Sequence, residues 1–443
     1  MTVPYPPEPT QFGPALAAHM GGRDHSQVGS MAGMTSDSLL QAMASLRGLA
    51  VGDALGSQFF VPDNRPHFDE RTLPPGRWQW TDDTEMACSV IHVLNTHGRI
   101  DQDVLAASFA ARHDFDRGYG PAANRLLRLV REGGDWRQLA GALFEGQGSY
   151  GNGAAMRVAP LGAWYAGDLD AAAEQAGLSS LVTHTHPEAV AGAVAVAVAA
   201  ALVAGGDDPA DPVEFLAAVA DRTPAGSVHA GIRTAAAIPN ETDPRQAGRV
   251  LGNGSAVSAV DTVPFTLWVA AHHRDDFTRA FWATAAAGGD IDTTCAIVGG
   301  ILAARGGPHR PPKAWWEQTE SLPRWAGRRA WPITMPRPIP APQRVYSDEQ
   351  WQQMQSGYTA RGMDEKWDLH VRDGWLYAHR SWTGNGMYAA RFVRDERGWS
   401  IAELHVERNQ DLYRADDDAH DTRLLETIVD AHLLGLGWNS TPR

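Results

Sequence analysis

The segment Gly48-Leu49-Ala50-Val51-Gly52-Asp53-Ala54-Leu55-Gly56 closes the first of a long series of helices that the sequence predicts. We expect this helix to begin near Ser36, because serine favours the N-cap position and the apolar residues that follow recur at helical spacing. Pro74-Pro75-Gly76 interrupts the chain before a second helix at 84–96. Further helices are expected at 104–112, 122–131, 170–176, 188–204, 212–221, 228–237, 263–271 and 276–287. The pattern therefore predicts a mainly helical protein.

The chain of 443 residues is too long for one ordinary domain of roughly 100–200 residues. Alternating prolines from Pro336 to Pro342 favour a stiff, extended linker. Beyond them, alternating apolar runs at 376–380 and 387–392 indicate strands, and a last helix is expected at 423–434. We predict a disordered leader, a helical core domain, a Pro-rich linker and a small α+β domain, at residues 1–36, 37–307, 308–345 and 346–443.

Composition and charge argue against several classes of protein. The formal net charge is −14, and no run of Lys or Arg is long enough to follow a phosphate backbone, so we expect no direct nucleic-acid ligand. The apolar stretch 189–204 is shorter than the roughly 20 residues that a bilayer requires. We expect it to be a buried helix and expect no membrane association. Cys88 and Cys295 do not make a disulfide framework, and the first 30 residues do not resemble a secretory signal, so we expect a cytoplasmic protein.

Two acidic clusters lie far apart in the sequence, and each stands where a loop enters a helix. They are Thr81-Asp82-Asp83-Thr84 and Gly288-Gly289-Asp290-Ile291-Asp292-Thr293. Successive residues of a helix point about 100° apart, so neighbouring acids can face one site only where the backbone is not yet helical. Each Asp could instead simply cap its helix. The two clusters together favour a shared site over two separate caps.

A shared acidic site calls for cations. Four carboxylates that converge without metal would repel one another, whereas two divalent ions would balance their charge. Carboxylate and hydroxyl oxygens favour Mg²⁺ or Mn²⁺ over Zn²⁺, for which His and Cys ligands would be expected. The sequence therefore predicts a dinuclear site that holds two Mg²⁺ or two Mn²⁺ ions.

Two Gly-rich loops precede helices and offer free backbone N–H groups that suit a diphosphate. They are Gly118-Tyr119-Gly120 and Ser149-Tyr150-Gly151-Asn152, and plain turns are the alternative because no strand precedes either loop. His184 and His186 lie at the start of the helix expected at 188–204. They could bind metal, but a role as helix cap or ligand contact is favoured because a carboxylate site already exists.

The order of these motifs resembles the ADP-ribosylglycohydrolase family, which includes the dinitrogenase reductase-activating glycohydrolase and the ADP-ribosylarginine hydrolases. The resemblance covers about residues 37–307 and implies an all-helical orthogonal bundle with two Mg²⁺ or Mn²⁺ ions in a central cleft. It is carried, in chain order, by Gly52-Asp53-Ala54-Leu55-Gly56, Thr81-Asp82-Asp83-Thr84, Gly151-Asn152-Gly153-Ala154-Ala155-Met156-Arg157, His184 and Gly289-Asp290-Ile291-Asp292-Thr293.

The resemblance also implies roles for individual residues. The implied metal ligands are Thr81, Asp82, Asp83, Asp290, Asp292 and Thr293. The residues that would hold the diphosphate and adenosine are Gly118, Tyr119, Gly120, Ser149, Tyr150, Gly151, Asn152 and His184. We expect Asp82, Asp83 and Asp292 to be catalytic. In the expected reaction the metals activate a water that attacks an oxocarbenium-like ribose, and Asp82 or Asp83 takes its proton.

The expected activity is removal of ADP-ribose from a modified protein side chain, with arginine as the favoured acceptor and free ADP-ribose as product. This sequence departs from the family pattern at one place that bears on which residue carries the ADP-ribose. Many relatives have a glutamate soon after the Gly-Asp-Ala-Leu-Gly motif. This chain has Ser57-Gln58-Phe59-Phe60-Val61 there. The rival expectation is a binding protein that uses residues 346–443 to occlude an ADP-ribosylating toxin or transferase, with or without hydrolysis.

The C-terminal domain is expected to recognise the protein that carries the modification, because Trp, Tyr and Arg are enriched at interface hot spots. The alternative is that its alternating aromatic residues form the core of their own sheet. The residues concerned are Trp375, Tyr377, Trp382 and Tyr388, with Arg372, Arg380 and Arg391.

Overall fold

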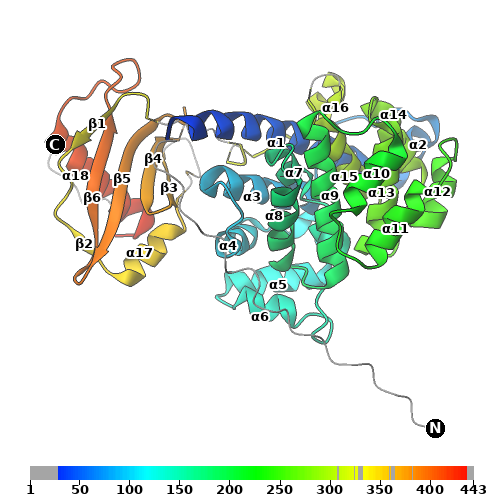
Figure 1. Cartoon of the computed structure of the whole chain (residues 1–443), viewed down its shortest axis with the longest axis horizontal. Coiled ribbons are helices and arrows are strands. Elements are labelled where there is room, and N and C mark those ends of the chain that lie inside the picture. Colours follow the sequence, from blue (N-terminus) through cyan, green and yellow to red (C-terminus); the bar gives the residue numbers. More distant parts are fainter. Residues whose placement is uncertain are drawn as a thin grey trace, which may run out of the picture.

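The computed structural model describes residues 28–306, 309–323, 325–327, 333–358, 360, 365–381 and 383–436. A helical body and a smaller part built on a β-sheet lie side by side (Figure 1). The N-terminal end of the long helix α1 reaches from the body toward strands β3 and β4 of the sheet (Figure 1). This architecture confirms the prediction of a mainly helical fold with a small C-terminal α+β part.

Seven of the sixteen described helices of the body begin at an Asp or Ser whose side chain accepts a hydrogen bond from an early backbone N–H group. Asp101 does so for α4, and Ser258 for α13. The helices are α1 (Val28–Ser57), α2 (Arg65–Glu70), α3 (Asp82–His97), α4 (Gln102–Arg112), α5 (Pro121–Arg131), α6 (Trp136–Gly141), α7 (Ala159–Trp164), α8 (Leu169–Leu181), α9 (Pro187–Gly205), α10 (Pro212–Ala220), α11 (Ser227–Ala236), α12 (Pro244–Leu251), α13 (Ala259–His273), α14 (Phe277–Ala286), α15 (Ile291–Ala303) and α16 (Lys313–Gln318). Short 3-10 turns are η1 (Gln58–Phe60), η2 (Pro62–Asn64), η3 (Phe115–Arg117) and η4 (Asn152–Ala154).

Helix α9 forms the centre of the body. Its sequence is almost entirely Ala, Val and Gly, and helices α7, α8 and α13 pack around it. Gly192 permits the close contact with α13, because a Cβ atom there would lie 2.8 Å from the side chain of Ala259. Among the described helices, α9 alone is long and apolar enough to cross a membrane, and 78% of that stretch is buried inside the protein. The expectation of a buried helix here is therefore confirmed.

Helices α1 and α15 approach each other along a row of glycines. Gly48, Gly52 and Gly56 recur every four residues and so share one face of α1. A Cβ atom on Gly52 would lie 2.1 Å from the carbonyl oxygen of Cys295, and one on Gly56 would lie 2.8 Å from the Cα of Asp292. These distances leave no room for a side chain. The contact therefore holds the first turn of α15 beside the last turns of α1.

The C-terminal part is an antiparallel sheet in the order β1-β6-β5-β4-β3, with β2 also paired to β6. Helices α17 and α18 contribute to the core on one face of the sheet. On this face the hydroxyls of Tyr388 and Tyr413 donate to the fully buried Asp421, which also pairs with Arg408 at 2.7 Å. The elements are β1 (Pro336–Ile339), β2 (Val345–Tyr346), α17 (Asp348–Gln355), β3 (Trp367–Arg372), β4 (Trp375–Arg380), β5 (Gly386–Asp395), β6 (Gly398–Glu407) and α18 (Asp418–Ile428), with a π-helical turn at Val429–Leu433.

The chain between the two parts differs from the Pro-rich linker predicted at 308–345. Helix α16 carries Trp315 into the core of the body, where its ring lies 5.2 Å from that of Phe281. Arg117 then pairs with Glu320 at 2.7 Å. Strands β1 and β2 at the end of the stretch belong to the sheet. Burial of tryptophan, rather than the stiffness of proline, decides where this segment lies.

Two helices also begin at other residues than predicted. Helix α1 begins at Val28 instead of near Ser36, so the leader predicted at 1–36 overlaps its first turns. Residues 1–27 lie outside the described part of the chain. The last helix begins at Asp418 instead of 423, because the side chain of Asp417 accepts a hydrogen bond from the N–H of His420.

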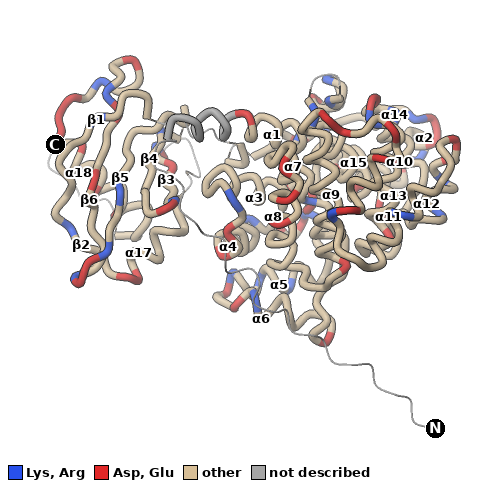
Figure 2. The backbone as a smooth tube through the Cα atoms, in the orientation of Figure 1, with Lys and Arg blue, Asp and Glu red and all other residues tan. Residues whose placement is uncertain are grey.

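The aromatic residues expected to recognise a partner separate into two groups. Tyr388 is 1% exposed and belongs to the core of the sheet, so the expectation was wrong for this residue. Trp375 and Tyr377 lie on the opposite face of β4 and are partly exposed, and the ring of Tyr377 stacks on His370 at 5.1 Å. Trp382 lies outside the described residues. Charged residues of both signs are interspersed over both parts of the molecule (Figure 2).

The glycine contact between α1 and α15 leads to a first prediction. We expect Gly52→Ala to lower the free energy of unfolding by about 1–3 kcal/mol or more, because the new methyl group forces the two helices apart. The matched control is Gly177→Ala in α8, where a Cβ would meet only Val190 at 3.9 Å. Alanine there is expected to stabilise the helix by up to about 1 kcal/mol. Chemical denaturation of both variants checks the opposite signs, and equal effects would contradict the prediction.

Candidate active site

Asp53, near the end of α1, is a fully buried carboxylate that organises the start of α3. It accepts hydrogen bonds from the backbone N–H groups of Thr81 and Thr84 at 3.0 and 3.1 Å. The hydroxyls of the same threonines donate to it at 2.8 and 2.5 Å. Thr81 makes no side-chain cap bond of its own. Asp53 therefore satisfies the first N–H groups of α3 from a different helix.

Three carboxylates converge next to this contact. Asp53, Asp83 and Asp292 each offer an oxygen atom, and these atoms lie within 4.8 Å of one another. The hydroxyls of Thr81 and Thr293 approach the Oδ2 atom of Asp83 at 3.1 and 3.4 Å. Of the predicted ligands, the structure thus brings Thr81, Asp83, Asp292 and Thr293 together, and it adds Asp53.

Burial and mutual repulsion disfavour the charged forms of these carboxylates. Burial, opposed by the threonine hydrogen bonds, raises the pKa of Asp53 to about 6. Burial together with the charge of Asp53 raises the pKa of Asp82 to about 8. The pKa values of Asp83 and Asp292 also rise well above the usual range, through burial and the neighbouring acids. No Lys or Arg side chain pairs with any of the four among the described ion pairs. The cluster lacks a positive charge from the protein itself.

The donor set fits a hard divalent cation. All the converging groups are carboxylate or hydroxyl oxygens, which such ions prefer. The Oδ1 atom of Asp83 is buried and has no hydrogen-bond partner among the described residues. An unpartnered buried carboxylate oxygen is costly unless a cation meets it. The simple capping alternative does not account for the clusters, because neither Thr81 nor Asp290 makes a side-chain cap bond.

Asp290 and Asp82 lie at the edge of the cluster. The Oδ2 atom of Asp290 accepts a hydrogen bond from the side-chain amide of Asn152 at 2.7 Å. That amide also donates to the hydroxyl of Thr262 at 3.1 Å. Asn152, predicted to contact substrate, is thus held by its side chain as a support for Asp290. Asp82 is partly exposed and lies beside Gly118, where a Cβ would come within 3.8 Å of its Oδ1 atom.

The first Gly-rich loop lies against the acidic cluster. Gly118 has a φ of 89°, which a residue with a side chain rarely adopts. The backbone of Gly118 to Gly120 leads into α5, whose first residue is Pro121. Tyr119 is 6% exposed and its hydroxyl donates to Glu85 at 2.7 Å. Its side chain therefore anchors the loop to α3.

The second loop rests on His184. A Cβ atom on Gly151 would lie 3.2 Å from the Nε2 atom of His184, and one on Gly153 would lie 3.0 Å from it. The Nδ1 atom of His184 bonds the hydroxyl of Thr183 at 2.7 Å. Burial and the charge of Arg157 lower the pKa of His184 to about 3. The neutral imidazole of His184 thus packs directly against Gly151 and Gly153.

Arg157, the last residue of the motif Gly151 to Arg157, also helps to support the second loop. It is fully buried and donates to the hydroxyl of Thr183 at 2.9 Å and to the carbonyl of Ser179 at 2.8 Å. Its guanidinium lies 4.6 Å from the ring centre of Phe109. Burial lowers the pKa of Arg157 to about 9, so it remains charged at neutral pH. Its position fixes the residues that hold the loop.

The outer side of the second loop carries exposed aromatic surface. Tyr150 is 49% exposed and Phe144 is 52% exposed, and their ring centres are 6.1 Å apart. The backbone carbonyl of Tyr150 accepts a hydrogen bond from the N–H of Ala259 at 3.1 Å, so the loop is tied to α13. Ser149 is 8% exposed, and its hydroxyl accepts from the N–H of Gly151 at 3.2 Å.

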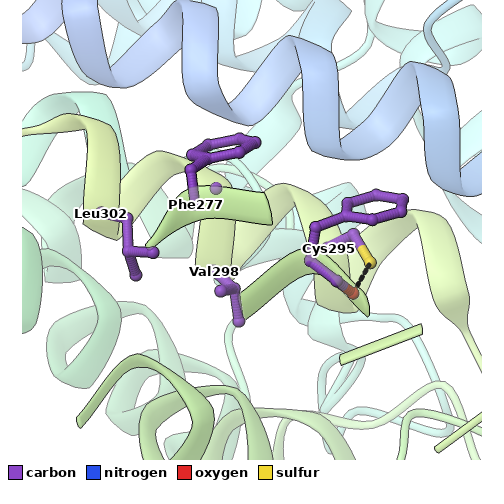
Figure 3. Close-up of a pocket in the computed structure, with 6 residues that line it drawn as sticks. Phe277, Cys295, Val298 and Leu302 are labelled. Carbon is purple, nitrogen blue, oxygen red and sulfur yellow. Dashed lines mark hydrogen bonds between the residues drawn. The ribbon is translucent and has the colours of Figure 1, made fainter. Parts of the chain in front are cut away.

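A separate small cavity between α14 and α15 is not part of the site. Figure 3 shows Phe277, Val298, Leu302 and Cys295 around it, with the Cys295 thiol directed at the carbonyl of Phe281. Its lining is apolar, and burial raises the pKa of Cys295 well above its usual range. Cys295 and the other buried cysteine, Cys88, pack in the core.

Sequence reasoning missed Asp53, Glu85 and Arg157 as residues of the site region. Asp53 lies between the glycines of the first motif, and an acid within an otherwise apolar helix was the available signal. Arg157 follows the Gly151 to Met156 run, and an isolated arginine next to apolar residues was a similar signal. Nothing in the sequence indicated that Glu85 would face Tyr119.

Comparison with known proteins identifies the family to which this helical body and its carboxylate cluster belong. The sequence model of the ADP-ribosylglycohydrolase family matches residues 34–336. The chain therefore belongs to the ADP-ribosylglycohydrolase family, and the resemblance drawn from its motifs is confirmed. It is accordingly a hydrolase of ADP-ribosylated substrates.

The chain is similar to several known proteins. The uncharacterized protein YegU of Escherichia coli is 31% identical over 296 residues, which cover 59% of this chain and 86% of that protein. The ADP-ribosylarginine hydrolase Tri1 of Serratia proteamaculans is 25% identical, over 64% of this chain and 76% of that protein. Human ADP-ribosylhydrolase ARH3 is 26% identical, over 64% of this chain and 90% of that protein. A solved chain titled ADP-ribosylglycohydrolase-related protein complex aligns at 24% identity and a TM-score of 0.48, over 66% of this chain and 96% of that chain.

The buried imidazole beneath the loop predicts a pH dependence. Because the pKa of His184 falls from 6.5 to about 3 on folding, the unfolded chain binds more protons between these values. The stability that the neutral imidazole of His184 contributes is fully present above pH 6.5. As the pH falls below 6.5, the free energy of unfolding decreases by about 1.4 kcal/mol per pH unit.

We expect His184→Asn to show a shallower loss of stability between pH 6.5 and pH 5 than the wild type, measured by chemical denaturation. The slope does not vanish, because burial also lowers the pKa of His92 to about 3. The control is His229→Asn at a partly exposed position in α11. An unchanged slope in His184→Asn would show that this imidazole takes up its proton in the folded state.

Proposed function

We propose that this protein removes ADP-ribose from modified arginine side chains of other proteins, in the cytoplasm, with two Mg²⁺ or Mn²⁺ ions. The observation that carries the proposal is the convergence of Asp53, Asp83 and Asp292 within 4.8 Å in a chain of this family. Their raised pKa values and the unpartnered Oδ1 of Asp83 support a role for cations at this point.

The ions would be held by oxygens of Asp53, Asp83, Asp292 and Thr293, with Thr81, Asp82 and Asp290 at the edge of the cluster. Divalent cations at such a site supply positive charge that eases ionisation of water and orients the sugar hydroxyls. Asp83 is buried and engaged by two threonines, whereas Asp82 is partly exposed. We assign acceptance of the water proton to Asp82 for this reason.

Hydrolysis breaks the bond between the anomeric carbon of the distal ribose and the acceptor nitrogen, and water supplies the new hydroxyl. The backbone of Gly118 to Gly120 lies beside Asp82, so a diphosphate bound by these N–H groups would place the attached ribose next to the acids. The exposed rings of Tyr150 and Phe144 suit the adenine, because a planar base stacks on aromatic surface.

Arginine is the favoured acceptor because two relatives are named ADP-ribosylarginine hydrolase. The segment Ser57-Gln58-Phe59-Phe60-Val61 carries no acid and does not itself distinguish arginine from other acceptors. The side chain of Gln58 donates to the carbonyl of Ala54 at 3.3 Å. The rival expectation of a protein that occludes a toxin has no described contact or surface in its favour.

Removal of one cluster charge tests the proposal. We expect Asp292→Asn to lose at least about 100-fold in turnover of an arginine-ADP-ribosylated peptide, because the cations lose a ligand. A chelator should abolish wild-type activity and Mn²⁺ or Mg²⁺ should restore it. Release of ADP-ribose is followed by chromatography. The control is Asp275→Asn at an exposed position, and full activity of Asp292→Asn would refute the metal site.

The aromatic surface gives an independent test. Tyr150→Ala is expected to weaken binding of free ADP-ribose by about 1–3 kcal/mol, because stacking on the adenine is lost. Calorimetric titration of the metal-loaded protein measures the change. Phe115→Ala removes a ring that is 73% exposed on η3 and serves as the control. Equal affinities of Tyr150→Ala and the wild type would place the adenine elsewhere.

A further inference from the structure

A small pocket on the helical body is lined by two arginines, an aspartate and two largely covered aromatic residues. It has a volume of about 60 Å³ and is lined by Phe68, Asp69, Arg71, Arg245, Trp282 and Ala286. These residues come from α2 and its C-cap, from the first turn of α12 and from α14. Figure 1 shows these three helices together at the end of the body away from the sheet.

The two guanidinium groups of this pocket lack acidic partners. Arg71 forms no ion pair or side-chain hydrogen bond among the described contacts. The described side-chain bond of Arg245 goes from Nε to the carbonyl of Ala286 at 3.3 Å. Asp69 is already paired with Arg65 at 3.1 Å. The carboxylate of Asp243 caps α12 by accepting the N–H of Arg245. The pocket therefore presents unpaired positive charge in a chain whose net charge is −14.

The pocket is connected to the acidic cluster through a rigid aromatic contact. The ring of Phe59 lies 5.2 Å from that of Phe68 and 5.6 Å from that of Trp282. Phe59 follows Gly56 by three residues, and a Cβ on Gly56 would lie 2.8 Å from the Cα of Asp292. The Gly118 loop, which we assign to the nucleotide, leads into α5. Figure 1 shows α5 at the bottom of the body, away from α2, α12 and α14, which line the pocket.

Size and charge define what the pocket can hold. At about 10–15 Å³ for each water-sized group, it accommodates roughly four such groups, far below the roughly 300 Å³ or more of a nucleotide pocket. A carboxylate with its adjoining methylene fits this volume. Arginine forks bind carboxylates through paired, charge-assisted hydrogen bonds, and the accessible lining of this pocket is mostly polar.

We propose that Arg71 and Arg245 bind an Asp or Glu side chain of the modified protein, close in sequence to the ADP-ribosylated residue. The pocket would then select acceptor proteins by an acidic neighbour. This inference rests on the proposed hydrolase function, and it names a specificity determinant outside the metal and nucleotide sites.

The test compares peptides that carry one ADP-ribosylated arginine and a single Glu at successive positions on either side, with a matched Gln series. For the wild type, we expect KM to be roughly three- to tenfold lower for the best Glu peptide than for its Gln counterpart, with similar kcat. The double variant R71E/R245E should abolish or invert this KM ratio. The control is Arg233→Glu, the same charge change at an exposed position of α11, which should keep the wild-type ratio.

Binding of fluorescent versions of the same peptides, measured by anisotropy, gives the ratio without turnover. Equal affinities of Glu and Gln peptides at every position would overturn the inference, as would a ratio that R71E/R245E leaves unchanged. If no peptide is hydrolysed but the Glu preference appears in binding and is lost in R71E/R245E, the pocket stands and the proposed function fails. Hydrolysis of both series at equal KM and affinity leaves the function standing and refutes the pocket.

Discussion

The contact between α1 and α15 is the constraint on which the rest of the site depends. Gly52 of α1 lies against the backbone of Cys295 and Gly56 lies against that of Asp292, at distances that exclude any side chain. Helices usually pack with their axes 8–10 Å apart because side chains separate them. Here the glycines let the backbones touch, so Asp53 on α1 comes within reach of Asp292 on α15. The third carboxylate, Asp83, is then drawn in by the hydrogen bonds from Thr81 and Thr84 to Asp53.

The burial of these carboxylates in one cluster lowers the stability of the folded protein. Burial raises the pKa values of Asp53 and Asp82, and the charge of Asp53 raises that of Asp82 further, so the ionised forms are disfavoured without a counter-charge. Apolar packing elsewhere supports that cost, above all around α9, which is buried by α7, α8 and α13. A divalent cation bound at the cluster would stabilise the folded state, since an ion that binds only the folded form shifts the folding equilibrium. Metal binding and folding are therefore expected to be linked.

The surroundings of the cluster combine rigid supports with open surface. Beneath the Ser149 to Gly153 loop, Arg157, Thr183 and His184 form a buried chain of hydrogen bonds, so the loop is held in place before any ligand arrives. On the outer side of this loop, Tyr150 and Phe144 remain exposed. Arg71 and Arg245 are also exposed, and neither has an acidic partner among the described ion pairs. Supports that are pre-organised limit the entropy lost on binding, whereas exposed groups supply the contacts that a ligand gains.

The sequence by itself determined the helical character, the two acidic clusters and the all-oxygen character of their side chains, because these follow from residue type and from spacing along one helix or loop. It also predicted most of the side chains that converge, since Thr81, Asp83, Asp292 and Thr293 lie at helix starts. Only the tertiary structure showed that Asp53 joins them.

The side chain of Tyr119 turns inward to Glu85, and the stretch after residue 307 packs on the body through Trp315. These outcomes depend on which faces of distant helices meet. Local sequence fixes the direction of a side chain relative to its own helix, but burial and contact are decided by the partner helix against which that face is packed.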